Sequence, residues 1–128
     1  MAYINHIGLY VKDIEASRIF FEKYFGAKSG EKYHNPRKSF SSYLMSFSDG
    51  ATLEIMNKPN LTSIAGGANN YGYAHISISV GSKEKVDELT MRLIDDGYSH
   101  IDGPRTTGDG YYESAILDAE GNVIEITV

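Results

Sequence analysis

A chain of 128 residues has room for one ordinary domain with a hydrophobic core and is too short for two independent ones. Its 41% hydrophobic and 23% charged residues are typical of a folded globular protein, not of a disordered segment. The net charge of −5 argues against a nucleic-acid-binding protein, because such proteins need clustered positive charge. The absence of cysteine excludes disulfides, thiolate metal ligands and a cysteine nucleophile.

The first residues carry no basic segment followed by a long apolar one, so we expect no secretory signal. No apolar run has the length needed to cross a bilayer. We therefore expect a cytoplasmic protein with no membrane or nucleic-acid partner.

The first half of the chain predicts a strand, a helix and further strands. Residues 3–12 alternate polar and aliphatic side chains, as in a strand with one buried face. A helix with an apolar stripe follows, capped by Asp13 and ended by Gly26. Two strands are then expected at 41–48 and 52–56.

The second half repeats this order. An alternating strand is expected at 74–80, and Ser82 caps a helix that ends near Gly97. Strands at 112–117 and 123–128 flank a four-residue turn. Weaker strand patterns near 28–33 and 98–101 would give each half a βαβββ plan. The chain is then a single domain, residues 1–128, with one module at about 1–56, a linker at 57–72 and a second module at about 73–128.

The polar faces of these strands carry two His–Glu sets at nearly equal spacing. His6 and His75 lie 69 residues apart, and Glu54 and Glu125 lie 71 apart. Alternation places all four side chains on the sheet face that the helices leave uncovered. One such histidine or glutamate alone is more often structural, but the repetition of both favours a shared role. Together they form a nitrogen and oxygen ligand set that suits Ni, Co, Zn, Mn or Fe(II).

We therefore expect an α+β fold, in which two paired βαβββ modules form a curved mixed sheet around a metal-lined cleft. The sequence resembles the vicinal oxygen chelate (glyoxalase/bleomycin resistance/dioxygenase) superfamily, and within it most resembles short bacterial glyoxalase I, a lactoylglutathione lyase. The matching motifs are His6-Ile-Gly-Leu-Tyr-Val-Lys-Asp-Ile, Leu53-Glu54-Ile55, Ala74-His75-Ile76-Ser77-Ile78-Ser79-Val80 and Asp118-Ala-Glu-Gly-Asn-Val-Ile-Glu125-Ile.

The resemblance implies a site in which His6, Glu54, His75 and Glu125 bind one divalent metal ion. It also implies a metal-dependent lyase or isomerase of glyoxalase type, acting on a vicinal-oxygen substrate such as a hemithioacetal of methylglyoxal. A Lewis acid would stabilise the enediolate while a carboxylate moves the proton. We expect Glu125 to be the base and Glu54 the second carboxylate ligand, although the two roles could be exchanged.

Two alternatives stay open on the same scaffold. A thiol transferase or dioxygenase would use His6, His75 and Glu125, and a drug- or metabolite-binding protein of the bleomycin-resistance kind would need no metal. Members of this superfamily commonly form homodimers, which we also expect here.

Substrate contacts are predicted at three further positions. Glyoxalase I has an arginine four residues after its first ligand, where it holds a glutathione carboxylate, but Tyr10 stands there in this sequence. Tyrosine supplies no positive charge, which argues against glutathione as the thiol. Arg37, Lys38 or Arg105 could supply the charge from loops. Arg105 lies in the glycine-rich segment 103–110, which is either a loop near the pocket or a hairpin connection.

Overall fold

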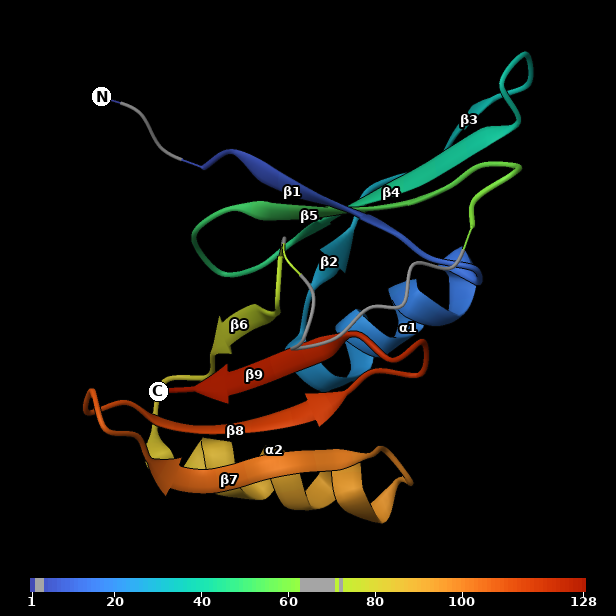
Figure 1. Cartoon of the computed structure of the whole chain (residues 1–128). Helices are drawn as coiled ribbons and strands as arrows, with labels where there is room; N and C mark the ends of the chain where they lie inside the picture. The colour runs from blue at the N-terminus through green and yellow to red at the C-terminus, as the bar shows by residue number, and fades with distance from the viewer. Residues whose placement is uncertain (2–3, 63–70, 72) are drawn as a thin grey trace. The chain divides into compact units, whose positions relative to one another are not determined.

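A computed structural model of the chain describes residues 1, 4–62, 71 and 73–128. The chain divides into two compact units, Met1–Thr62 and Ser63–Val128. Each unit has its own sheet and its own helix (Figure 1). Within the described residues, no helix is both long and apolar enough to span a membrane.

The first unit contains a mixed sheet and one helix. Its sheet has the strand order β1-β5-β4-β2, with β3 paired to β4. Strands β1 and β5 run parallel, and the other neighbours are antiparallel. The elements are β1 (His6–Tyr10), α1 (Ile14–Phe25), β2 (Lys28–Ser29), β3 (Tyr33–Asn35), β4 (Phe40–Ser46) and β5 (Thr52–Asn57).

Helix α1 begins and ends at the residues that the sequence predicts. The Asp13 carboxylate accepts a hydrogen bond from the Ala16 amide at 2.9 Å, which satisfies one free N–H of the first turn. Gly26 has a φ of 64° and ends the helix in the left-handed conformation. Phe21 is fully buried, and Phe20 packs against it at a ring centroid distance of 5.1 Å. The apolar stripe of α1 therefore covers one face of the first sheet.

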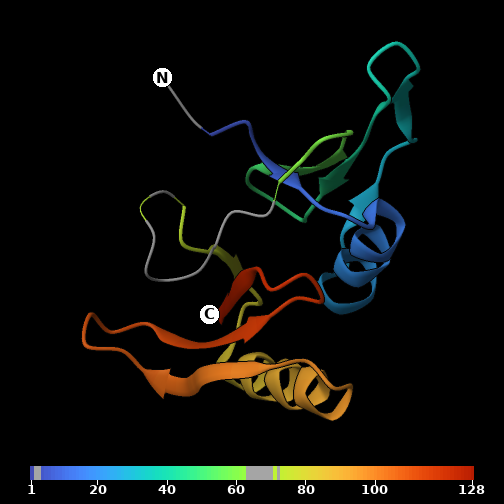
Figure 2. The same ribbon diagram turned by 45° about the vertical axis from the view of Figure 1, so that its right-hand side comes forward.

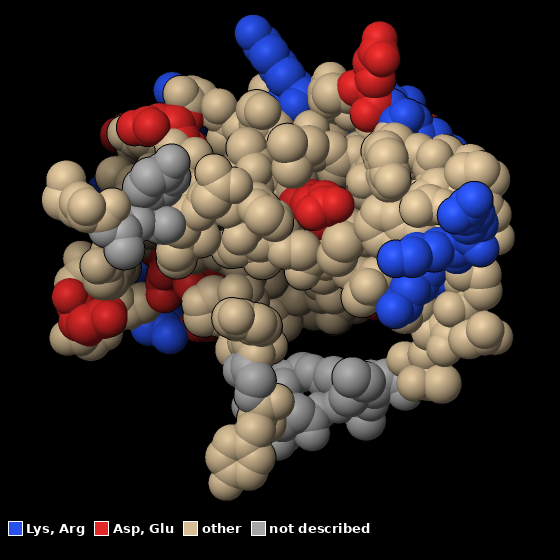
Figure 3. All heavy atoms as spheres, turned by 90° about the horizontal axis from the view of Figure 1, so that it is seen from above, with Lys and Arg blue, Asp and Glu red and all other residues tan. Residues whose placement is uncertain are grey.

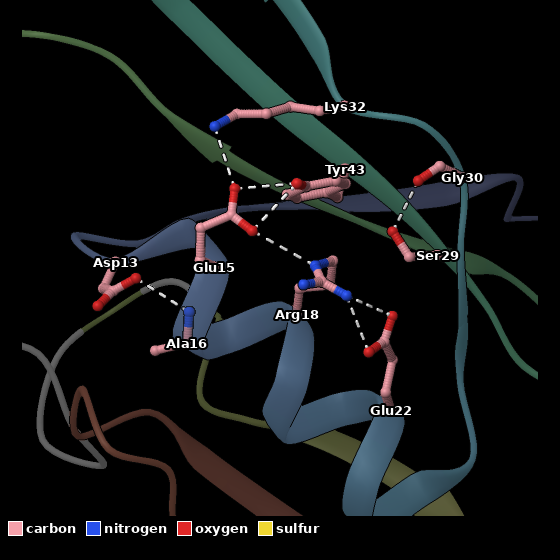
Figure 4. Close-up of polar contacts among 9 residues, drawn as sticks. All are labelled: Asp13, Glu15, Ala16, Arg18, Glu22, Ser29, Gly30, Lys32 and Tyr43. Carbon is pink, nitrogen blue, oxygen red and sulfur yellow. Dashed lines mark hydrogen bonds and ion pairs between the residues drawn. The ribbon is translucent and has the colours of Figure 1, made fainter.

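A polar network also fastens α1 to its sheet (Figure 4). The Tyr43 hydroxyl of β4 donates to the Glu15 carboxylate at 2.9 Å, and the Lys32 ammonium donates to the same carboxylate at 3.0 Å. The Arg18 guanidinium binds the Glu22 carboxylate through two contacts and lies 5.4 Å from the centre of the Tyr43 ring. These side chains lie on the helix-covered side of the sheet, so the network is structural.

The second unit repeats the plan with four strands. Its sheet has the order β6-β9-β8-β7, with β6 and β9 parallel and the other neighbours antiparallel. Helix α2 lies along this sheet (Figure 2) and buries Val86 and Leu93, while the sheet contributes Ile116, Ile124 and Ile126 to the same core. The elements are β6 (Ile76–Ser79), α2 (Lys83–Asp95), β7 (His100–Thr106), β8 (Tyr112–Leu117) and β9 (Val123–Thr127).

The predicted α+β class with two modules is confirmed, and several boundaries differ. Strand β6 begins at Ile76, opposite Ile124, and not at residue 74, which in the same register would lie opposite Asn122, before the start of β9. The region 28–33 holds β2 and the start of β3, and β7 extends well past residue 101. Asn57, expected in the linker, belongs to β5, while 63–70 and 72 lie outside the described residues. A single curved sheet formed by both modules stays a prediction.

Candidate metal centre

The first unit brings His6 and Glu54 together on neighbouring parallel strands. Gly8 of β1 is the ladder partner of Glu54 on β5, and His6 lies two residues before Gly8 on the same face. The His6 Nε2 and Glu54 Oε2 atoms are 3.8 Å apart. Leu53 and Ile55, on either side of Glu54, are buried on the helix side. Glu54 therefore points to the face that α1 does not cover, as predicted from alternation.

The second unit brings His75 and Glu125 together in the same way. Ser77 of β6 is the ladder partner of Glu125 on β9, and His75 lies two residues before Ser77. The His75 Nε2 and Glu125 Oε2 atoms are 3.1 Å apart. His75 itself lies just before β6, so the prediction that all four residues lie within strands is wrong at this position. The duplication seen in the sequence thus extends to the hydrogen-bond register of the two parallel ladders.

Both pairs are open enough to receive a ligand. The two histidine side chains are 50% and 41% exposed, and the two glutamates are 27% and 22% exposed. A metal ion with bonds of about 2.0–2.2 Å to nitrogen and oxygen holds neighbouring ligand atoms about 3 Å apart. The 3.1 Å between the His75 and Glu125 atoms is close to that value, whereas the 3.8 Å between the His6 and Glu54 atoms is longer, so a shared ion would draw the first pair closer together.

Each unit supplies one such pair. Within the part of the chain that the structure describes, no group of three or more histidine, aspartate or glutamate side chains that could hold a metal ion is present. Two protein ligands are fewer than the three or four typical of a zinc site. The convergence of both pairs on one ion therefore stays a prediction.

The sequence analysis did not single out Glu113, a carboxylate on the open face of the second sheet. Glu113 of β8 is the ladder partner of Thr127, and the next residue on the same face, Ala115, is the partner of Glu125. Burial raises the pKa of the Glu113 carboxyl, and the nearby Glu125 carboxylate raises it further. Alternation along 112–117 could have placed Glu113 on the open face, but its position beside Glu125 depends on the β8–β9 register.

Arg105 lies beside Glu113, at a bulge in β7. Asp102 pairs with Ala115 and Arg105 with Glu113, so three residue steps on β7 match two on β8. The bulge places both side chains on the open face, where the Arg105 Nε donates to the Asp102 carboxylate at 2.8 Å. The start of segment 103–110 therefore belongs to β7, and its remainder forms the β7–β8 connection.

The other two predicted substrate residues lie in the first unit. Tyr10 is 45% exposed at the end of β1, and the Lys58 ammonium lies 5.2 Å from the centre of its ring. Lys58 therefore places a positive charge beside Tyr10, whose own side chain is uncharged. Lys58 was not among the predicted site residues. Arg37 lies in the turn between β3 and β4, where its backbone N–H donates to the Asn35 side chain.

Charged side chains are dispersed on the face seen in Figure 3. Lysine and arginine form small groups, separated by uncharged and acidic side chains. The face in view carries no continuous basic stripe of the kind that follows a phosphate backbone.

The chain matches a known protein family over nearly its whole length. The family model described as Glyoxalase/Bleomycin resistance protein/Dioxygenase superfamily matches residues 3–126. A search of curated proteins finds no match.

Many solved structures have the same fold. A possible glyoxalase from Bacillus cereus is 26% identical, with a TM-score of 0.71 and coverage of 98% of this chain and 97% of that one. The trypanothione-dependent glyoxalase I of Leishmania major is 20% identical, with a TM-score of 0.77 and coverage of 99% and 86%. The fosfomycin resistance protein FosX from Listeria monocytogenes, in complex with Mn(II) and sulfate, is 20% identical, with a TM-score of 0.73 and coverage of 100% and 93%.

Proposed function

Because the chain belongs to the glyoxalase/bleomycin resistance protein/dioxygenase superfamily, we propose that it is a metal-dependent lyase or isomerase of glyoxalase type. Its substrate is a small molecule with vicinal oxygens, such as a hemithioacetal of methylglyoxal. The superfamily membership fixes the scaffold, whereas the particular reaction is inferred from the side chains of this chain.

One observation carries the proposal: the same His–Glu pair occurs at the same ladder register in both modules. A structural role for each pair would not require the two registers to agree. If the pairs converge, they supply two imidazoles and two carboxylates, namely His6, Glu54, His75 and Glu125, which is a suitable set for Ni, Co, Zn, Mn or Fe(II). The FosX complex with Mn(II) supports the idea that this fold can hold such an ion.

The bound ion would act as a Lewis acid on the substrate oxygens. The residues of the chain do the rest of the chemistry. The imidazoles of His6 and His75 orient the site, and a glutamate carboxylate takes the proton from one carbon and returns it to the next. We assign this proton transfer to Glu125, with Glu54 as the second carboxylate ligand. The protein is further proposed to act as a cytoplasmic homodimer.

The test is the metal content of the untagged protein, measured by elemental mass spectrometry. We expect about one divalent ion per chain, with a large loss in His6→Ala and in Glu125→Ala. His34→Ala is the matched control, because His34 lies on β3 with its ring bonded to Ser41 and belongs to neither pair. No metal in the protein, and no uptake of Ni, Co, Zn or Mn, would contradict the proposal and favour a metal-free binding protein.

Glu54→Ala separates the remaining candidates. A lyase that uses four ligands loses both metal affinity and turnover in this variant. Retention of both would instead favour a transferase or dioxygenase that uses His6, His75 and Glu125. Full turnover by Glu125→Gln would contradict the assignment of the base.

A further inference from the structure

We infer that Glu113 contacts the substrate and selects molecules that carry a positive charge or a hydrogen-bond donor beyond their metal-binding oxygens. This inference rests on the proposed function, because that function places the head of the substrate beside His75 and Glu125. It adds a specificity residue outside the four predicted ligands and narrows the class of substrate.

The register of the second sheet sets the position of Glu113. Ala115 lies directly opposite Glu125 in the β8–β9 ladder, and Glu113 is the next residue along β8 on that face. Such diagonal neighbours lie about 7–8 Å apart, which is within reach of two glutamate side chains. The flanking Ser114 is buried and the flanking Tyr112 donates its hydroxyl to Asp87 of α2, so the Glu113 side chain must lie on the open face.

Glu113 has no ion pair or hydrogen bond with another described side chain. The nearest candidate is Arg105, its ladder partner on β7, but that guanidinium is bonded to the Asp102 carboxylate at 2.8 Å. A half-buried carboxylate without a hydrogen-bond partner loses part of its hydration with no hydrogen bond to replace it. A donor group on a bound molecule would restore that hydrogen bond.

The surface beside Glu113 leaves space for such a group. Ala115, between the Glu113 and Glu125 positions, has only a methyl side chain, and Ser77 is the small residue on the other side of Glu125. A molecule whose head lies at Glu125 can therefore extend across Ala115 towards Glu113. Thr127, opposite Glu113, borders the other side of this path, and its hydroxyl donates to the Tyr112 carbonyl oxygen at 3.3 Å.

The charges around this path favour a cation and oppose an anion. Glu125 and Asp109 are both near enough to raise the pKa of the Glu113 carboxyl. His75 and Arg105 lower this pKa, each by less than Glu125 or Asp109 raises it, and the Arg105 Nε is hydrogen-bonded to the Asp102 carboxylate, so these groups do not reverse the local charge. A substrate with a carboxylate beyond its vicinal oxygens would meet like charge here, whereas an ammonium or hydroxyl group would be attracted.

The first test compares hemithioacetals of methylglyoxal made from three thiols of similar size. They are 2-(dimethylamino)ethanethiol, which is cationic, 1-propanethiol, which is neutral, and 3-mercaptopropionate, which is anionic. The tertiary amine prevents cyclisation to a thiazolidine. We expect kcat/KM to be about tenfold higher for the cationic than for the anionic adduct, and Glu113→Gln to reduce this ratio to near one. Glu88→Gln is the control, since Glu88 is exposed on α2 and should keep the full ratio.

The second test measures binding without turnover. Hydroxamates also present two vicinal oxygens, and 3-aminopropanohydroxamate, butyrohydroxamate and the monohydroxamate of succinate form the same charge series. Calorimetry on the metal-loaded protein, and on the metal-free protein if no metal binds, should give the same order of affinity and the same loss in Glu113→Gln.

The two tests separate the two proposals. The expected order of affinities without any turnover would refute the glyoxalase chemistry and leave the role of Glu113 standing. Equal turnover or equal binding across a charge series would overturn the role of Glu113 without affecting the glyoxalase chemistry. The same conclusion would follow if Glu113→Gln kept the wild-type order of affinities. If no hydroxamate binds in either form of the protein, the role of Glu113 is also overturned. Metal content equal to wild type in Glu113→Gln is expected, because Glu113 is not one of the proposed ligands.

Discussion

The close approach of β7 to β8 at Gly103 allows the effect of one methyl group to be worked out from the structure. A Cβ atom added at Gly103 would lie 2.4 Å from the Glu113 carbonyl oxygen and 3.0 Å from the Ser114 Cα atom. Both contacts are with backbone, which cannot rotate away as a side chain can. In addition, Gly103 has a φ of +71°, a conformation that costs a residue with a Cβ atom about 1–2 kcal/mol.

The same hairpin contains two glycines that separate these effects. Gly110 has a φ of +92° but nothing within 4 Å of an added Cβ atom, whereas Gly108 has neither a positive φ nor a close neighbour. Gly108→Ala should change the free energy of unfolding by less than about 1 kcal/mol and in the stabilising direction. Gly110→Ala should lose about 1–2 kcal/mol. Gly103→Ala should lose about 2–5 kcal/mol, because overpacking adds about 1–3 kcal/mol to the backbone cost.

Urea unfolding followed by circular dichroism measures all three variants under the same conditions. The reasoning requires the order Gly108→Ala, Gly110→Ala, Gly103→Ala in increasing loss of stability, with unchanged m-values. If Gly103→Ala is no less stable than Gly110→Ala, the close approach of the two strands is refuted. Since Gly103 abuts the backbone of Glu113, we also expect Gly103→Ala to weaken the charge selectivity assigned to that residue.

Three further predictions concern stability. Tyr43→Phe should unfold at a lower urea concentration at pH 7, because its hydroxyl donates to the Glu15 carboxylate; an unchanged midpoint would mean that the network does not fasten α1. The pKa of the Glu15 carboxyl is lowered from its ordinary value of 4.5, chiefly by the Lys32 hydrogen bond. Its contribution to stability is therefore present above pH 4.5 and is lost as the pH falls through the folded pKa, so Glu15→Gln should flatten the stability profile below pH 4.5. The pKa of the Glu113 carboxyl is raised by burial, so the folded state loses stability as the pH rises from 4.5 through the folded pKa. Glu113→Gln should remove this loss and unfold at the same or a higher urea concentration than wild type at pH 7. A lower unfolding midpoint would point to a structural role for Glu113.

Local patterns were sufficient for much of the fold. The caps at Asp13, Gly26 and Ser82 are local chemistry, and each lies where the sequence places it. Alternation also assigned Glu54 and Glu125 to the open faces, because buried aliphatic residues flank each of them. These features depend only on residues a few positions away in the chain.

Features that depend on strand pairing were not predictable in this way. The bulge between Asp102 and Arg105 inserts one residue relative to β8, and no local signal fixes its position. The importance of Glu113 depends on its diagonal position relative to Glu125, which follows from the β8–β9 register and not from the sequence pattern alone. His75 lies outside β6, whose ladder begins with the pair Ile76 and Ile124, although the alternation of the sequence continues through residue 75.

The parallel ladders also indicate where this scaffold can change during evolution. The ladder partners of β1 and β5 recur in β6 and β9 with the same relation between histidine and glutamate, although the spacing from histidine to glutamate is two residues longer in the second half. The extra residues lie between the helix cap and the glycine after the helix, because Asp13 and Gly26 are 13 residues apart whereas Ser82 and Gly97 are 15 apart. Each helix packs on the face of its sheet opposite the glutamate, so a change in helix length does not displace the His–Glu pair. The length of the helix can therefore change during evolution while the ligand geometry of the sheet is inherited unchanged.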